Sequence, residues 1–383
     1  MPVADVIVDR IVTQSLRVAR FEAGTRRKVR GLLRDVEADV LAQLLRRDPT
    51  GVTSQKFRDR RLRALREQIR QSLNSSYRAI GTAMNEDLRA LSIVESGFAT
   101  QSINGAIGAQ VLSTEIAPAL ARSLVSGLTV QGAPSREWWA TQSRTLERKF
   151  STQVRLGMAS GEGIGDISRR IRGTRANGFA DGIMQTSRRE ADALVRTSVQ
   201  TLSNNARMET FRANSDVVKG MQTVTTLDEK TTDICIALTG ASWDLDGKPL
   251  PESAWQGDQP PGPPFHWNCR TTMAAVLRSF EEIANLSPAK ARAIEKSAPD
   301  FAKASMDGQL AKDITFDKFL KGKSVSFQNA QLGKTRAGLW RDGRLPLNKL
   351  IDQSARPLSV AGLRKSVKGV TQKAVTAAKA GEL

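Results

Sequence analysis

The chain has few of the residues on which many small folds and active sites depend. Its 383 residues include two cysteines, one histidine and one tyrosine, and aromatic residues make up only 5%. Two cysteines cannot form a disulfide framework, so a reducing compartment is the default expectation. The scarcity of aromatic residues leaves Ala, Leu, Ile and Val to form the core, which favours helices packed on helices.

Long apolar runs are also missing. No stretch reaches the roughly 20 apolar residues that a membrane-spanning helix needs, so we expect no stable membrane span. The N-terminus has no basic segment followed by an apolar run, and it therefore shows no signal peptide. These features favour the cytoplasm, or a particle that is assembled there.

Positive charge is what the sequence has in excess. It contains 58 Lys and Arg against 39 Asp and Glu, a formal net charge of +19. The excess is spread out, since residues 1–90 carry 19 basic against 11 acidic residues and residues 281–383 carry 19 against 10. Spread charge suits a protein that lies near concentrated DNA without reading its sequence. The alternative is an ordinary solvated basic surface.

Apolar periodicity predicts helices over the first part of the chain. Residues 3–48 and 54–95 repeat apolar side chains at steps of three and four, and the Asp-Pro-Thr-Gly segment at 48–51 separates them. We predict that residues 1–95 form basic amphipathic helices and an elongated N-terminal part. Residues 96–134 are rich in Gly, Ser and Ala and nearly free of charge, which predicts a flexible connector with one or two short helices.

The next segment, residues 135–280, is predicted to be a domain of its own. Its first half is helical, with Ser135 and Asp166 as candidate helix caps on either side of a glycine-rich break at 157–165. The helix predicted over 184–211 carries one apolar stripe and should therefore have a buried face. That stripe comprises Ala191, Leu194, Val195, Val199, Leu202, Ala206 and Phe211.

Residues 215–280 change period and predict a compact α+β module. Residues 217–227 alternate like a strand, and residues 237–253 carry the Gly and Asp-Gly punctuation of a β-hairpin. A Pro-rich loop follows, and residues 271–280 predict a closing helix or strand. Residues 281–383 predict a basic helical C-terminal region and tail. The predicted fold is therefore mainly α with a small α+β module that contains both cysteines and the histidine.

Those three residues form the most informative constellation in the sequence. His266 and Cys269 are three residues apart, and Cys235 precedes His266 by 31 residues. Structural zinc sites use four thiolate or imidazole ligands, and only three such ligands exist here. Asp228 or Asp233 could supply a carboxylate as the fourth. A structural zinc ion is therefore one interpretation of this cluster.

Two other interpretations use the same residues. In the first, the cysteines pack as small apolar side chains and the histidine hydrogen-bonds to a carbonyl or carboxylate, without metal. In the second, Cys235 and His266 form the nucleophile and base of a hydrolase or transferase, which requires a third group to orient the base. The sequence has no serine-hydrolase elbow, phosphate loop or zinc-protease motif, and Gly161–Gly165 lacks the Lys of a nucleotide loop. We therefore do not expect an enzyme.

Three blocks of sequence resemble one known family. The block TLDEKTTDICIALTG at 226–240, together with PPFHWNCRTT at 263–272, is similar to the signature of the phage Mu F-like head morphogenesis proteins. The helix VRTSVQTLSNNARMETF at 195–211 and the segment at 319–352 are also similar to that family. The resemblance covers roughly residues 135–360. Its family pattern falls on Asp228, Cys235, Gly240, His266, Asn268, Cys269 and Arg270, for which it implies a structural role.

The resemblance implies a function in the virion. It implies a minor head protein of a tailed bacteriophage that lies near the portal vertex, is assembled in the host cytoplasm and binds portal, capsid or scaffold proteins. It also implies a role in DNA packaging or delivery, with non-specific contact to packaged DNA. The alternatives from other classes are the Cys235/His266 enzyme and a protein that binds DNA by charge alone.

Overall fold

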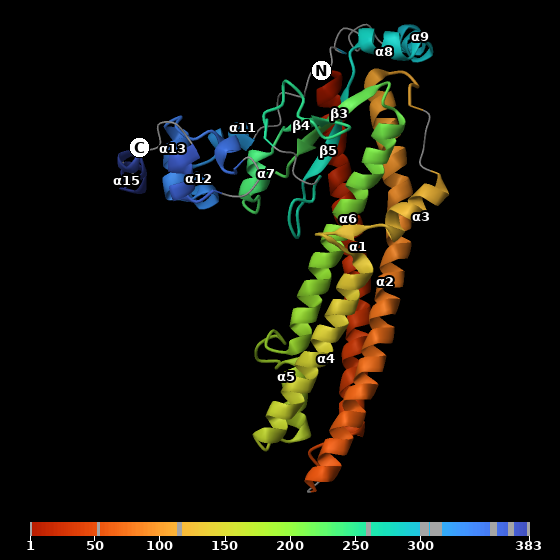
Figure 1. Cartoon of the computed structure of the whole chain (residues 1–383), viewed down its shortest axis with the longest axis vertical. Helices are drawn as coiled ribbons and strands as arrows, with labels where there is room; N and C mark the ends of the chain where they lie inside the picture. Colours follow the sequence, from red (N-terminus) through yellow and green to blue (C-terminus); the bar gives the residue numbers. More distant parts are fainter. Residues whose placement is uncertain are drawn as a thin grey trace. The chain divides into compact units, whose positions relative to one another are not determined.

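The structure is a computed structural model that describes residues 2–51, 54–112, 117–257, 262–298, 306, 316–352, 358–366 and 371–380. These residues form 14 α-helices, one 3-10 helix and five short strands (Figure 1). The prediction of a mainly helical chain with a small sheet is therefore confirmed. None of the helices in these ranges is long and apolar enough to cross a membrane.

The chain divides into two compact units, and three long helices contribute to both. Unit 1 contains residues 1–17, 92–121 and 203–383, and unit 2 contains residues 18–91 and 122–202. The shared helices are α1 (Val3–Arg46), α2 (Gln55–Ile107) and α6 (Ile183–Ala213). The division by contacts thus differs from the predicted division by sequence order.

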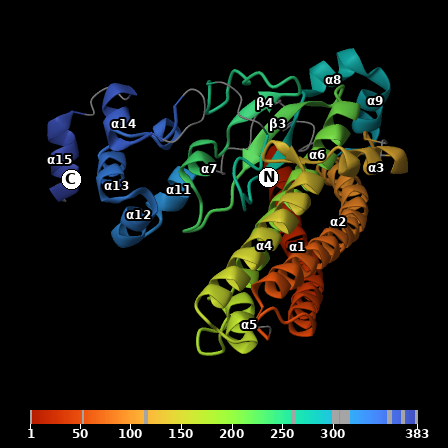
Figure 2. The same cartoon turned by 60° about the horizontal axis from the view of Figure 1, so that its bottom comes forward.

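Unit 2 is a bundle built from α1, α2, α4 and α6, which run side by side in both views (Figures 1 and 2). Of these four helices, α4 comprises Ser135–Ala159. The other elements of this unit are the end of α3 (Pro118–Ser126), β1 (Thr129–Val130), β2 (Ala133–Pro134) and α5 (Ile164–Arg172). Each long helix buries one apolar stripe, as their periodicity predicts. All seven residues of the stripe predicted on α6 are buried.

Charged side chains join the helices of unit 2 around this apolar centre. Arg30 of α1 pairs with Asp192 of α6, and Arg188 of α6 pairs with Glu37 of α1. Arg66 of α2 lies 3.4 Å from Glu147 of α4. Because each acid involved is mostly enclosed by helices, these pairs align the helices more specifically than apolar contact alone.

The centre of unit 1 is an antiparallel sheet with strand order β4-β3-β5. Its strands are β3 (Val218–Val224), β4 (Ser242–Asp244) and β5 (Thr272–Leu277). Every residue of β5 is buried, so both faces of the sheet are covered. The predicted strand at 217–227 is confirmed, and the segment at 271–280 resolves into a strand followed by a helix that begins at Phe280.

Two apolar clusters cover this sheet. One joins it to the start of α1, the end of α2, and the helices α8 (Phe280–Leu286) and α9 (Pro288–Ser297). The other joins it to α7 (Asp233–Ala237) and to the C-terminal helices. Those helices are α11 (Phe316–Lys321), α12 (Val325–Leu332), α13 (Lys334–Arg341), η1 (Leu347–Lys349), α14 (Val360–Ser366) and α15 (Gln372–Ala380).

The structure corrects three predictions of local structure. The expected connector at 96–134 is not one flexible segment, because α2 continues to Ile107 and buries Ile103 in the core of unit 1. Ser135 is the first residue of α4 and does not cap it, since Pro134 holds the cap position. Likewise Gly163, and not Asp166, precedes α5. Tertiary burial decided the first case, and backbone conformation decided the other two.

A buried ion pair lies where α2 and α6 enter unit 1. The side chains of Arg207 on α6 and Glu95 on α2 form a direct ion pair and are 1% and 0% exposed. Gln14 of α1 donates a hydrogen bond of 2.7 Å to the other oxygen of Glu95. Arg207 also donates to Thr272 on β5 and lies over the ring of Phe98. One charged pair therefore connects three helices and the sheet.

We predict that breaking this pair strongly destabilises the protein. The substitution Arg207→Met leaves the Glu95 carboxylate buried without a counter-charge, which should cost about 3–5 kcal/mol of unfolding free energy. Replacing both residues, Arg207→Met with Glu95→Leu, should recover much of the loss because no buried charge remains. Urea unfolding followed by circular dichroism measures both effects.

The same helix offers a matched control. Arg212 pairs with Glu209 at the surface, with 54% of the arginine side chain exposed. Arg212→Met should therefore cost less than about 1 kcal/mol. Equal losses for Arg207→Met and Arg212→Met would contradict the role assigned to the buried pair.

Candidate metal centre

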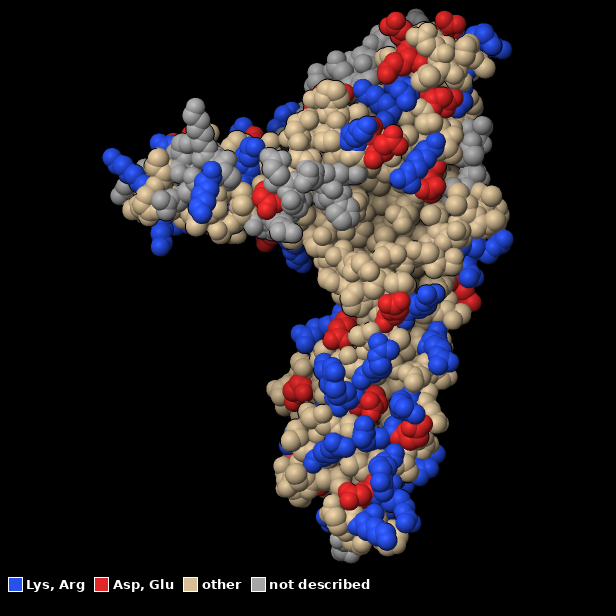
Figure 3. All heavy atoms as spheres, in the orientation of Figure 1, with Lys and Arg blue, Asp and Glu red and all other residues tan. Residues whose placement is uncertain are grey.

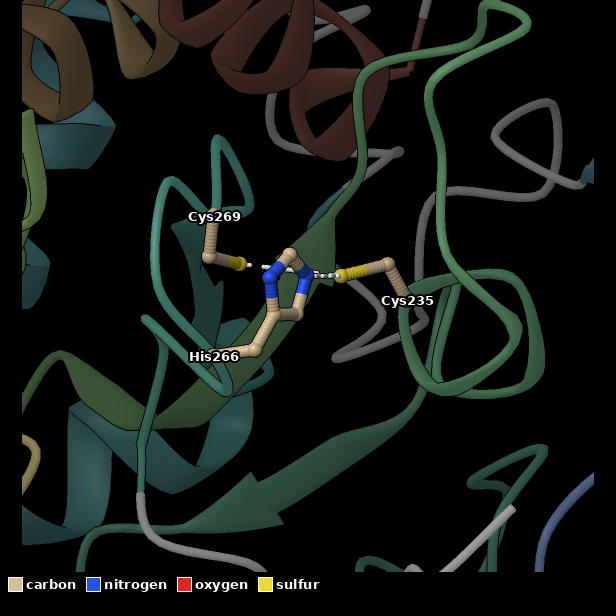
Figure 4. A group of neighbouring side chains, drawn as sticks. All are labelled: Cys235, His266 and Cys269. Carbon is tan, nitrogen blue, oxygen red and sulfur yellow. Dashed lines mark hydrogen bonds between the residues drawn. The ribbon is translucent and has the colours of Figure 1, made fainter. Parts of the chain in front are cut away.

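The two cysteines and the histidine lie together in unit 1, as the sequence suggests. Cys235 is on α7, the short helix between β3 and β4, and His266 and Cys269 lie on the loop that leads into β5. The backbone amide of Cys269 donates a 3.1 Å hydrogen bond to the carbonyl of His266. This turn places both side chains on the same side of the loop, facing α7 (Figure 4).

Two sulfur atoms and one nitrogen atom form a tight triangle. The Cys235 Sγ lies 3.2 Å from the His266 Nε2 and 3.6 Å from the Cys269 Sγ. All three candidate ligand atoms lie within 4.8 Å of one another. Both cysteines are 3% exposed, and the histidine is partly exposed. Among the residues that the structure describes, no other group of three such side chains comes this close.

The histidine ring is held in one orientation by the backbone. Its Nδ1 lies 2.8 Å from the carbonyl oxygen of Trp267, which can only accept a hydrogen bond. The proton of a neutral ring therefore belongs on Nδ1, and the lone pair of Nε2 points toward the sulfur of Cys235. A histidine that binds a metal commonly donates its other N–H in this way.

The electrostatics of the cluster favour one negative sulfur. The hydrogen bond from Cys235 and the adjacent His266 lower the pKa of the Cys269 thiol to about 4, despite the opposing effect of burial. The neighbouring Cys269 sulfur and burial together raise the pKa of Cys235. Hydrogen bonding to Cys269 raises the pKa of His266. These shifts favour a Cys269 thiolate beside a histidine that holds its proton more strongly.

The two aspartates suggested as a fourth ligand are occupied elsewhere. Asp228 accepts two hydrogen bonds from Arg270, at 2.5 and 2.6 Å. Asp233 pairs with Arg336 of α13 at 2.5 Å. Neither carboxylate belongs to the triangle. The structure thus assigns both aspartates to ion pairs, a choice that spacing along the sequence could not make.

The remaining residues of the predicted motif shape the backbone around the cluster. Gly240 and Asn268 both have positive φ angles, 74° and 62°, which glycine and asparagine adopt more readily than other residues. Gly240 closes the turn from α7 into β4, and its amide bonds to the Thr223 carbonyl. Asn268 lies in the turn between His266 and Cys269. Both residues therefore set the path of the chain that carries the ligand atoms.

Several threonines support the cluster, and sequence reasoning missed them. Thr232 Oγ1 lies 2.9 Å from the His266 Nε2, and the hydroxyls of Thr225 and Thr239 both donate to the carbonyl of Cys235. Thr231 binds the α12 side chain of Gln331 through its carbonyl, at 2.6 Å. The density of threonine between residues 223 and 239 was the available signal.

A small pocket opens beside the triangle, and its lining bears on catalysis. Cys235, His266 and Arg270 line it, together with threonines from both segments, whereas Cys269 does not. Cys269, whose thiol has the lowered pKa, is thus shielded from the pocket, while Cys235, which lines the pocket, has a thiol with a raised pKa. A nucleophilic cysteine needs both an accessible sulfur and a thiolate. This arrangement does not favour the Cys235/His266 enzyme.

Comparison with known protein families identifies the segment that carries this cluster. Residues 148–274 match the family model of Phage Mu protein F like proteins. The matched segment begins within α4, ends in the middle of β5 and contains all three residues of the triangle. No curated protein and no solved structure matches the chain at the threshold applied.

The resemblance inferred from the sequence motifs is confirmed over this segment. The matched segment is similar to Phage Mu protein F like proteins. It covers about a third of the residues. The similarity suggested for residues 319–352 lies beyond it and stays a prediction.

The Asp228–Arg270 pair gives a prediction about stability and pH. The Arg270 guanidinium holds the pKa of Asp228 below its usual value of 3.8. The pair therefore stabilises the fold fully above pH 3.8, and this contribution is lost as the pH falls through the lowered pKa. We expect Asp228→Asn to lower the melting temperature at pH 7, and the difference from the unsubstituted protein to shrink toward pH 3.

An exposed carboxylate on the β4 turn provides the control for this comparison. Asp246→Asn makes the same change of charge at an exposed position. Calorimetry at several pH values should show little effect of that control substitution at any pH. An Asp228→Asn deficit that persists unchanged at pH 3 would argue against the ion pair as its cause.

Proposed function

We propose that this protein is a minor head component that binds portal or capsid proteins during phage head assembly. The observation that carries the proposal is the Phage Mu F-like match over residues 148–274. That segment supplies parts of both units, because α4 and α5 lie in unit 2 and the sheet lies in unit 1. The surface of either unit could therefore receive the partner.

The distribution of charge favours contact of unit 2 with acidic protein surfaces or with DNA. Its residues include 30 Lys and Arg against 16 Asp and Glu, so this unit carries +14 of the total of +19. The excess is thus concentrated, in contrast to the even spread that counts along the chain suggest. Figure 3 shows Lys and Arg side chains closely spaced over the helices of this unit.

The buried chemistry of the chain agrees with binding rather than catalysis. In the Cys235, His266 and Cys269 cluster, the thiol with the lowered pKa belongs to Cys269, which does not line the pocket. We therefore infer that the cluster stabilises the fold of unit 1. Assembly then depends on surfaces and not on a reaction.

The proposal predicts association with assembling heads. Co-expression with the portal and major capsid proteins of the same phage should cause the chain to sediment with procapsids in a gradient. Heads assembled without the chain should be defective in DNA packaging or delivery. The proposal is lost if the chain stays in the soluble fractions and phage that lack it form normal, infectious heads.

Non-specific DNA contact is a second candidate function, which the basic surface of unit 2 favours. Several arginines near the start of α2 are exposed, including Arg60, Arg61 and Arg63. Binding that depends on such side chains weakens linearly with the logarithm of salt concentration, by a slope of about 0.9 per phosphate contact. Replacing all three arginines with alanine should lower this slope.

A matched triple variant in unit 1 controls for net charge. Lys248, Arg292 and Lys296 are exposed and belong to that unit, so their replacement with alanine removes the same charge. Fluorescence anisotropy with duplex DNA of random sequence should show a smaller change in slope for this control. Equal slopes for both triple variants would mean that unit 2 has no specific role in binding DNA.

A further inference from the structure

We propose that Cys235, His266 and Cys269 bind one Zn²⁺ ion, whose fourth coordination position faces the pocket beside α7. The proposal rests on the positions of the three ligand atoms and is independent of the partner that the head protein binds. It assigns a metal site to a cluster that sequence alone leaves open among metal, apolar packing and catalysis.

The geometry of the triangle matches tetrahedral zinc. Zinc lies about 2.3 Å from a thiolate and about 2.0–2.1 Å from an imidazole nitrogen, which separates two sulfurs by about 3.8 Å and a sulfur from a nitrogen by about 3.5 Å. The observed separations are 3.6 Å between sulfurs and 3.2 Å between the Cys235 Sγ and the His266 Nε2. These two separations need an adjustment of only a few tenths of an ångström to admit the ion, and the three ligand atoms all lie within 4.8 Å of one another.

The donor set selects zinc over other metals. Two thiolates and one imidazole are soft or borderline ligands that suit zinc, whereas calcium and magnesium prefer oxygen. An iron–sulfur cluster held entirely by cysteine would need four thiolates, and the chain has only two. The Nδ1–H of His266 bonds to the Trp267 carbonyl, so Nε2 is the ring nitrogen left to bind the ion, which would replace its contact with the Thr232 hydroxyl.

The fourth ligand is a water molecule in the pocket. Asp228 and Asp233 are engaged with arginines, and the described residues offer no further Cys, His, Asp or Glu within the group. Cys235 and His266 both line the pocket, which opens toward solvent and is bordered by threonine hydroxyls that can hydrogen-bond to a bound water. Thr232 is placed for this, since its hydroxyl is 2.9 Å from the His266 Nε2.

The ion would add a third link between the segment that follows β3 and the loop that leads into β5, which the β3–β5 pairing and the Asp228–Arg270 pair already join. It joins α7 to the loop before β5. Asp233 of α7 pairs with Arg336 of α13, and Thr231, which lies just before α7, accepts a hydrogen bond from Gln331 of α12. These contacts attach the α7 segment to the C-terminal helices. Zinc would thus stabilise the attachment of these helices to the sheet. Its loss should loosen this side of unit 1 first.

Metal analysis of the untagged chain tests the proposal directly. A polyhistidine tag must be avoided because its histidines bind zinc themselves, whereas the chain has only one histidine, His266. We expect close to one zinc per chain by plasma emission spectrometry, and a Co²⁺-substituted protein with the strong visible absorption of a tetrahedral thiolate site. Cys235→Ser and Cys269→Ser should each reduce bound zinc at least tenfold and lower the melting temperature.

Asp228→Asn is the matched control, because it alters a neighbouring acid that the structure excludes from the site. This variant should retain zinc at the level of the unsubstituted chain. Titration of free thiols in denaturant, after chelation, should find two thiols per chain. A chain that holds no zinc after expression and purification with zinc present would overturn the proposal. So would an absence of free thiols, which would indicate a disulfide, or zinc retention by both serine variants.

Discussion

The ion pair between Arg207 and Glu95 is the constraint on which the architecture of unit 1 most depends. Two charges without solvent contact are costly unless they meet in good geometry with their remaining hydrogen-bonding capacity used. Gln14 and Thr272 supply part of that capacity from α1 and β5, whereas the buried Nε of Arg207 has no hydrogen-bond partner. The pair therefore specifies the relative positions of three helix segments and one strand, which apolar packing by Ala, Leu and Val would specify less well.

The same need for exact placement governs the cluster of Cys235, His266 and Cys269. Its ligand atoms come from two segments, and the positive φ angle of Asn268 and the Nδ1 hydrogen bond of His266 orient one of them. Threonine hydroxyls fix the backbone of the other. A site supported in this way by secondary contacts is prepared for a metal before the metal binds. These supporting contacts also explain why the sequence motif includes Gly240 and Asn268 besides the three ligand residues.

The distribution of charge separates the roles of the two units. Unit 2 concentrates basic side chains on long helices, whereas unit 1 has nearly balanced charge and contains the buried ion pair and the cysteine cluster. A surface of concentrated positive charge attracts nucleic acid and acidic protein surfaces without selecting a sequence. The precise buried contacts thus belong to unit 1 and the concentrated positive charge to unit 2.

Local patterns in the sequence determined the main helices, the strand β3 and the composition of the site, but not the end of α2 or the helix caps. Periodicity alone predicted the buried stripe of α6 and the strand β3, because helices and strands repeat their side chains at fixed steps. The spacing of His266 and Cys269 predicted that these two residues act together, because one turn of chain connects them. The presence of both cysteines in the same short module suggested the third ligand.

Only the tertiary structure decided how distant segments meet. No local pattern distinguishes Arg207 from the exposed arginines of the same helix, because its partner lies 112 residues earlier in the chain. For the same reason, the sequence could not tell that Asp228 and Asp233 bind arginines rather than a metal. The charge-poor end of α2 resembled a linker, yet burial against α1 and the sheet makes it part of the core. Burial and ion pairing are properties of the folded chain, and they decide which of several residues of the same type lies in the core, forms an ion pair or stays at the surface.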